Sequence, residues 1–145
     1  MNTINEQSEF FCDIAQQINS IYEEYAKSVG LSYTSLYVLH MIALVENCTQ
    51  KYIAEQMYLP KQTINSVITT FCKQGLVGLM ELPEDRRHKV LRLTEKGQDF
   101  ANSILPKIEQ AEQRSMEQFD VEEREIMFRL IKKYSNIFAK ELLKK

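Results

Sequence analysis

The chain has 145 residues, of which 44% are hydrophobic and 26% charged, a balance typical of a folded globular protein that excludes a disordered chain. Its three cysteines are odd in number and widely spaced, which excludes a disulfide framework and favours a reducing cytoplasm. The formal net charge of −2 argues at first against a nucleic-acid partner.

The distribution of charge reverses that first conclusion. Residues 49–97 hold eight Lys or Arg against five Asp or Glu, and the rest of the chain holds ten against fifteen. A basic centre between acidic flanks concentrates attraction for phosphate on one part of the surface. The first six residues lack the basic and apolar regions of a signal peptide, and the longest apolar run, residues 36–45, is too short to span a bilayer. We therefore expect a cytoplasmic protein without a membrane partner.

Two helices are predicted before the basic centre. Apolar residues recur every three or four positions along residues 7–29, which predicts a long helix that ends at Gly30. Ser32 is a good N-terminal cap for a second helix over residues 33–45. We expect this second helix to pack beneath the elements that follow it.

Residues 49–74 have the pattern of two short helices joined by a tight turn. Thr49 can cap the first helix, and residues 58–60 break its pattern before the second begins. The buried face of the second helix, residues 61–74, is expected to hold Ile64, Val67, Ile68 and Phe71. The opposite face is polar but holds no acid. It offers short amides and hydroxyls, the groups that bond base edges and phosphates.

A β-hairpin is predicted next. Residues 77–82 and 89–93 have the composition of strands, and the turn-rich loop between them, residues 83–88, carries two arginines. The order of helix, turn, helix and hairpin with a basic tip is that of a winged helix-turn-helix, which binds duplex DNA. The expected fold is therefore mainly α with a small β-hairpin wing.

At these residues the chain resembles the MarR family of bacterial transcription regulators. Asp85-Arg86-Arg87 followed by residues 90–97 is similar to the family's wing motif, and residues 53–65 are similar to its helix-turn-helix. Pro60 departs from the pattern, because the family often has Ser or Thr there and proline has no side-chain oxygen to cap a helix or contact phosphate. The resemblance implies a DNA-binding regulator, more often a repressor than an activator.

Two further helices are predicted after Thr94, the second of them starting at a capping sequence, Asp120 to Glu123. Together with the first helix they carry more apolar surface than a monomer of this size can easily hide, and the resemblance implies a homodimer paired through the first and last helices. A two-fold dimer places its recognition helices about 34 Å apart, which matches a pseudo-palindromic operator. The residues expected in the dimer interface are Phe11, Ile14, Ile18, Leu130, Ile131, Tyr134 and Phe138.

The predicted elements divide the chain into three functional segments. Residues 1–30 form an N-terminal dimerisation helix, residues 31–97 form the winged helix-turn-helix lobe, and residues 98–145 form C-terminal dimerisation helices. Such a terminal arrangement leaves the central lobe to contact DNA.

The candidate DNA contacts come from the second helix of the helix-turn-helix and from the wing. Recognition helices present their N-terminal part to the bases, so Gln62 and its neighbours are expected to read sequence while lysines meet phosphate. One wing arginine is expected to enter the minor groove, with Asp85 orienting a neighbouring arginine by a charge-assisted bond and His88 as a bystander. The candidate DNA-binding residues are Lys61, Gln62, Thr63, Asn65, Ser66, Thr69, Lys73, Arg86, Arg87 and Lys89.

Other classes of function fit the sequence less well. The chain has only two histidines, and it has no Ser-His-Asp set, Gly-rich phosphate loop or metal-spaced cluster. We therefore predict no enzyme activity, no cofactor and no metal site. A winged helix that binds only protein is an alternative, although the acid-free helix face and the wing arginines favour DNA.

The sequence leaves two possible regulatory signals open, a small aromatic effector and oxidation of a cysteine. The resemblance implies a small aromatic effector in a cleft, and the alternative is that the rings which could line such a cleft fill a helical core instead. These rings belong to Tyr22, Tyr25, Tyr33 and Tyr37. A redox-sensing regulator acting through Cys12 is a further alternative, because some family members sense peroxides through a cysteine on the first helix. In those members the cysteine lies at the place that Ser8 fills here.

Overall fold

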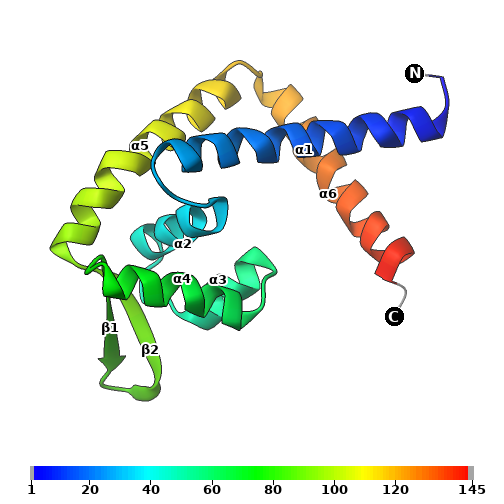
Figure 1. Cartoon of the computed structure of the whole chain (residues 1–145). Coiled ribbons are helices and arrows are strands. Elements are labelled where there is room, and N and C mark those ends of the chain that lie inside the picture. Colours follow the sequence, from blue (N-terminus) through cyan, green and yellow to red (C-terminus); the bar gives the residue numbers. More distant parts are fainter. Residues whose placement is uncertain (1, 144–145) are drawn as a thin grey trace. The chain divides into compact units, whose positions relative to one another are not determined.

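The computed structural model describes residues 2–143, which form six helices and one antiparallel hairpin (Figure 1). In chain order the elements are α1 (Ile4–Ser28), α2 (Tyr33–Leu44), α3 (Gln50–Met57), α4 (Lys61–Lys73), β1 (Val77–Leu82), β2 (Asp85–Leu93), α5 (Glu95–Glu117) and α6 (Val121–Leu143). The chain divides into two compact units between Ile104 and Leu105, so α5 belongs to both. The predicted fold class, mainly α with a hairpin wing, is confirmed.

Helix α1 begins three residues earlier than its apolar pattern predicts. The Oγ1 of Thr3 accepts a hydrogen bond from the Glu6 backbone N at 3.2 Å, and the Glu6 carboxylate accepts one from the Thr3 backbone N at 3.0 Å. These reciprocal bonds form a capping box, which satisfies amide groups that the first turn leaves unpaired. The expected start at residue 7 was wrong because the cap lies outside the apolar seam.

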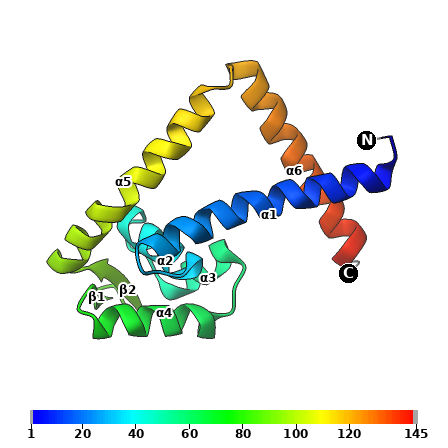
Figure 2. The same ribbon diagram turned by 45° about the horizontal axis from the view of Figure 1, so that its top comes forward.

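The core of the first unit surrounds α2. Both views of the unit place α2 between α1 and the pair α3 and α4 (Figures 1 and 2). Ser32 caps α2 as predicted, accepting a bond from the Ser35 backbone N at 3.0 Å. The buried side chains of the unit include Leu36, Val38 and Leu39 from α2, Ile53 from α3, Ile64, Ile68 and Phe71 from α4, and Val90 and Leu91 from β2. Helix α2 therefore supports the helix-turn-helix, as the sequence predicted.

The hairpin is extended at its base by the loop before α3. An isolated bridge joins Thr49 to Val90, and the Leu91 backbone N donates to the Cys48 carbonyl at 2.8 Å. Cys48 is fully buried under this bridge, and burial raises the pKa of its thiol to about 11. The thiol stays protonated at neutral pH and acts as a small apolar side chain.

The junction between α4, the wing and α5 is built on Thr94. Its backbone N donates to the Leu76 carbonyl at 3.0 Å, and its Oγ1 donates to the Gly75 carbonyl at 2.6 Å. The same Oγ1 accepts from the Gly97 backbone N at 3.0 Å. A Cβ on Gly97 would lie 1.9 Å from the Leu76 carbonyl oxygen, so this close approach of two backbones requires glycine.

The turn from α3 to α4 contains a strained residue. Tyr58 caps α3 in the left-handed conformation with φ of 54°, and the Leu59 backbone N bonds to the Ala54 carbonyl at 3.1 Å. For a residue with a Cβ this conformation costs about 1–2 kcal/mol. Glycine and asparagine adopt it more readily than an aromatic residue does.

The second unit contains the end of α5 and the whole of α6. Asp120 and Glu123 form the predicted capping box at the start of α6, with reciprocal backbone-to-carboxylate bonds of 2.9 Å each. Helix α5 continues through Pro106, and α6 has no buried residue. No helix within residues 2–143 is long and apolar enough to cross a membrane.

Candidate nucleic-acid interface

Helix α4 presents the polar face that the sequence predicts. Its apolar face, with Ile64, Ile68 and Phe71, is buried against the core of the first unit. The other side of the helix is exposed and contains no acidic residue. The exposed residues are Lys61, Gln62, Thr63, Asn65, Ser66, Thr69, Thr70 and Lys73, which include every candidate from this helix. The candidate residues from this helix therefore lie together on one accessible surface.

The N-terminus of α4 is held by α3 and has no side-chain cap. Pro60 occupies the cap position without a side-chain hydrogen bond, and the Thr63 backbone N donates to the Pro60 carbonyl at 3.1 Å. The side chain of Gln50 donates from its Nε2 to the Lys61 carbonyl at 2.9 Å. Sequence reasoning missed Gln50, because a polar residue at the start of a helix gives no sign of a bond to a residue eleven positions later.

Hydroxyl groups on α4 are partly used within the helix. The Ser66 Oγ donates to the Gln62 carbonyl at 3.1 Å, and the Thr70 Oγ1 donates to the Ser66 carbonyl at 3.0 Å. In this rotamer the Ser66 hydroxyl can accept a bond from outside but has no proton to donate. The side-chain amide of Gln62 makes no hydrogen bond within the described part of the chain.

The wing is more extended than its composition predicts. Strand β2 begins at Asp85, so only Pro83 and Glu84 form the turn, and the loop expected over residues 83–88 was wrong. The register runs evenly to Glu81 opposite Lys89 and then jumps to Leu82 opposite Asp85. The three residues between these pairs, Arg86, Arg87 and His88, therefore form a bulge without cross-strand partners. A bulge bends a strand and redirects its side chains, and here it displays both arginines as exposed groups.

Asp85 orders this bulge through bonds that differ from the expected one. Its Oδ1 accepts from the Arg87 backbone N at 3.0 Å, and its Oδ2 lies 2.7 Å from the Nδ1 of His88. The side-chain bond from His88, followed by the Arg87 backbone bond, lowers the pKa of the Asp85 carboxyl below its ordinary value. His88 is thus part of the wing's internal bonding, and its expected role as a bystander in DNA binding stays a prediction.

Comparison with known proteins finds similarity to one family of regulators. The sequence model of the MarR family matches residues 29–88, from the end of α1 into the wing. The structure of NMB1585, a MarR family regulator from Neisseria meningitidis, matches with a TM-score of 0.81 and 25% identity over 95% of this chain and 97% of that one. The chain is similar to MarR family regulators in sequence and in fold.

Two further proteins are similar to this chain, one in sequence and one in fold. The HTH-type transcriptional regulator SarZ of Staphylococcus epidermidis is 30% identical over 97 residues, which cover 67% of this chain and 65% of SarZ. The match therefore spans slightly less than two thirds of that relative's length. The S. aureus MepR–DNA complex shares the fold, with a TM-score of 0.76 at 17% identity over 90% of this chain and 95% of that one. SarZ and NMB1585 are both described as regulators.

The helices that the MarR resemblance assigns to dimerisation expose apolar side chains. On α1, Phe11, Ile14 and Ile18 are exposed, and the exposed apolar residues of α6 include Leu130, Ile131, Tyr134 and Phe138. Tyr134 and Phe138 stack with ring centroids 5.8 Å apart. The predicted dimer residues thus lie on two exposed apolar faces, one in each unit.

The four tyrosines of the predicted effector cleft fall into two groups. Tyr33 lies between Tyr22 and Tyr37, with ring centroids 5.7 and 6.2 Å away, and Tyr37 is 6.1 Å from the ring of His40. The hydroxyl of Tyr25 instead donates to the Ile104 carbonyl at 2.7 Å. The aromatic cluster is half-buried, and Tyr25 holds α1 to α5 within the first unit.

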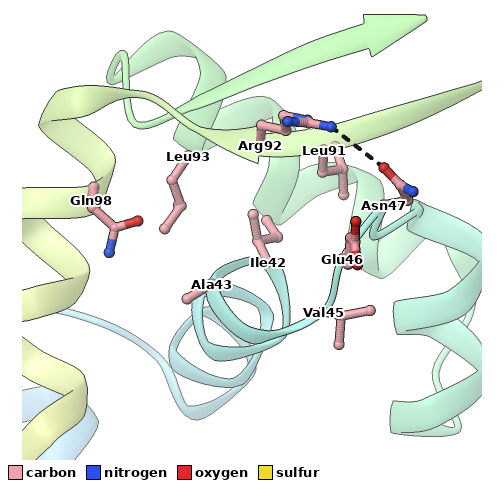
Figure 3. Close-up of a pocket in the computed structure, with 9 residues that line it drawn as sticks. All are labelled: Ile42, Ala43, Val45, Glu46, Asn47, Leu91, Arg92, Leu93 and Gln98. Carbon is pink, nitrogen blue, oxygen red and sulfur yellow. Dashed lines mark hydrogen bonds between the residues drawn. The ribbon is translucent and has the colours of Figure 1, made fainter. Parts of the chain in front are cut away.

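A cavity of about 200 Å³ lies elsewhere in the first unit, at the base of the wing (Figure 3). None of the four tyrosines lines it. Figure 3 shows Arg92 pointing toward Asn47, with its Nη2 3.4 Å from the Asn47 Oδ1. The lining residues are Ile42, Ala43, Val45, Glu46, Asn47, Leu91, Arg92, Leu93 and Gln98. Within residues 2–143 there is no group of three or more His, Cys, Asp or Glu placed to hold a metal ion.

Proposed function

We propose that this chain, which is similar to MarR family regulators, is a sequence-specific DNA-binding repressor that binds a pseudo-palindromic operator as a homodimer. The observation that carries the proposal is the exposed, acid-free face of α4, which joins amides and hydroxyls to a lysine at each end. A surface that only needed solubility would mix acids with bases, whereas phosphate repels acids. The DNA complex of MepR, which shares this fold, supports the proposal.

The two parts of the surface would take different tasks on DNA. Helix α4 would enter the major groove, where Gln62, Thr63, Asn65, Ser66 and Thr69 face the base edges. Lys61 and Lys73, at its ends, would meet phosphates. The bulged wing would bring Arg86 or Arg87 to the adjacent minor groove, whose narrow A·T-rich stretches attract arginine, with Lys89 on the flanking backbone.

A homodimer follows from the exposed apolar faces of α1 and α6. Ile18, Leu130, Ile131 and Phe138 are each 50 or 51% exposed in the single chain. Contiguous apolar surface of this kind is a mark of an interface. A two-fold pair would present two copies of α4 about one helical turn of DNA apart.

The proposal is tested by selecting fragments from the source genome with the purified protein and measuring affinity for the selected site and for random DNA. A double variant, Arg86→Ala with Arg87→Ala, should weaken binding to both DNAs. It should also reduce the slope of log affinity against log salt by about 2–4, because the double variant removes up to four arginine contacts with DNA phosphates per dimer. Fluorescence anisotropy at several salt concentrations gives both quantities.

The matched control removes the same charge elsewhere. Arg129→Ala with Lys133→Ala takes two cations per chain from exposed positions of α6 and should leave the salt slope unchanged. Equal slopes for the wing and α6 variants would contradict the wing assignment. A wild-type protein that selects no DNA would favour the alternative, a winged helix that binds only protein.

Release by a small aromatic effector is a second proposal, favoured by the cluster of Tyr22, Tyr33 and Tyr37. Phenolic compounds that stack on such rings should lower the affinity for the operator. Redox release through Cys12 has less support, because the thiol is exposed but no basic residue lies within four positions of it. We expect peroxide to leave operator binding unchanged in the wild type and in Cys12→Ser alike.

A further inference from the structure

The turn of the helix-turn-helix carries a side chain that the fold does not use. Tyr58 is 94% exposed, the highest value among the large apolar and aromatic side chains of residues 2–143. Within those residues its hydroxyl makes no hydrogen bond and its ring makes no ring contact. The side chain therefore adds no packing or bonding to the folded chain.

The backbone at this position makes the presence of tyrosine more unusual. Its φ of 54° lies in the left-handed region, which bulky residues avoid. The bonds that end α3 come from backbone N–H groups of Tyr58 and Leu59, and glycine or asparagine would make them with less strain. Neither capping nor packing explains the tyrosine, and strain without an internal benefit is typical of functional positions.

The position of Tyr58 in the chain indicates which part of a bound DNA its side chain would contact. It stands three residues before Lys61, whose carbonyl is fixed by the Gln50 side chain, and before the uncapped first turn of α4. When α4 lies in a major groove, the segment before its N-terminus faces the sugar-phosphate backbone at the edge of that groove. A phenol at this edge offers one uncharged O–H donor to an acceptor that carries negative charge.

We propose, on the basis of the DNA-binding function proposed above, that the Tyr58 hydroxyl donates a hydrogen bond to a backbone phosphate oxygen beside the α4 groove. This contact fixes the position of the turn on the duplex without reading sequence. It also differs from a lysine or arginine contact in one measurable way. A neutral donor displaces no condensed counterion, so it adds affinity without adding to the salt dependence.

The test uses two substitutions in the full-length dimer. Tyr58→Asn keeps a residue that tolerates the left-handed conformation, and Tyr58→Phe keeps the ring but removes the hydroxyl. Both should lower affinity about tenfold or more for operator and random DNA alike, with the salt slope unchanged. The melting temperature of Tyr58→Asn should equal or exceed that of the wild type, because the strain is relieved.

A control variant and the outcomes below make the test decisive. Asn47→Gly, at the other non-glycine residue with positive φ, should leave DNA affinity unchanged. Full affinity in Tyr58→Phe, a loss confined to the operator, or a fall in melting temperature that accompanies the loss of binding would each overturn the proposal. Failure of the wild type to bind any DNA would instead overturn the proposed function itself.

Discussion

At the scale of single residues, internal hydrogen bonds determine which polar side chains of α4 and the wing still have donors or acceptors for an outside partner. Ser66 and Thr70 direct their protons to helix carbonyls, whereas the amide of Gln62 keeps two donors and an acceptor for an outside partner. In the wing, both oxygens of Asp85 are occupied by Arg87 and His88. Gln62 is therefore the leading candidate for base readout, and Asp85 is a candidate for ordering rather than contact.

Gln62→Ala should weaken operator binding by about 1–3 kcal/mol and change binding to random DNA little, because a glutamine amide pairs with adenine through two specific bonds. Affinities for both DNAs are measured at one salt concentration, with circular dichroism as a check of folding. Gln74→Ala, the same change at the exposed C-terminal end of α4, is the control and should alter neither affinity. Equal losses on both DNAs would show that Gln62 touches only the backbone.

Asp85→Ala should lower affinity for DNA even though it removes a negative charge from the wing. The pKa of Asp85 in the folded chain lies below its ordinary value, so its ordering effect is fully present above that ordinary pKa and is lost as pH falls through the folded pKa. At neutral pH the carboxylate is ionised and the bulge is ordered. Binding at pH 7 measures the effect.

Glu84, the residue before Asp85, supplies a control that separates the effect of losing a negative charge from the effect of losing the ordered bulge. Glu84→Ala removes the same charge from the exposed turn and should raise affinity for DNA, because Glu84 only repels phosphate. An increase in affinity from both alanine variants would mean that Asp85 acts through charge alone.

At the scale of elements, apolar spacing predicted the buried face of a helix correctly, whereas polar residues gave a wrong boundary for a strand. Ile64, Ile68 and Phe71 on the buried face of α4 were predictable, since spacing by three and four residues fixes which side is buried. The start of β2 was not, because Asp85, Arg86, Arg87 and His88 have the composition of a turn. Their extended conformation depends on the Asp85 bonds and on a register jump, both of which need the folded hairpin.

The candidate DNA surface shows the same division. Its residues on α4 could be found from the sequence because a helix has a fixed period. Gln50 and His88 could not, since each bonds across a turn whose geometry the sequence leaves open. Tyr58 gave no signal either, because its φ and exposure are properties of the folded turn.

Gly97→Ala should destabilise the fold by about 1–3 kcal/mol, because the new methyl group would meet the Leu76 carbonyl and force two backbones apart. Urea denaturation followed by circular dichroism measures the change. Gly78→Ala is the matched control in β1, where an added Cβ has no neighbour within 4 Å. It should be neutral or slightly stabilising, and an equal loss in the two variants would contradict the close-approach argument.

At the scale of the whole molecule, the proposed homodimer would bring two copies of α4 to one operator. Helix α6 has no buried residue in the single chain, although much of its length is apolar. Helices of this kind gain their stability from packing rather than from intrinsic propensity. The folding of the second unit and the assembly of the dimer are therefore expected to be coupled.

Ile131→Asp should dissociate the dimer or unfold its C-terminal helices, because a lone carboxylate in an apolar interface has no partner. Sedimentation velocity over a range of concentrations gives the oligomeric state. Lys133→Asp places a carboxylate two residues away, at an exposed position of the same helix, and should remain dimeric. A folded Ile131→Asp dimer would remove α6 from the interface.

The bonds of Thr94 also constrain the DNA that the protein can accept. They tie the residues that follow α4 to the end of β2, and we therefore expect α4 and the wing to move as one body. One base pair inserted inside a half-site, between the bases proposed to contact α4 and the minor groove proposed for the wing, adds about 3.4 Å of rise and roughly 34–36° of rotation. A rigid lobe cannot follow this added rise and rotation of the DNA. Either α4 or the wing would then lose its contact.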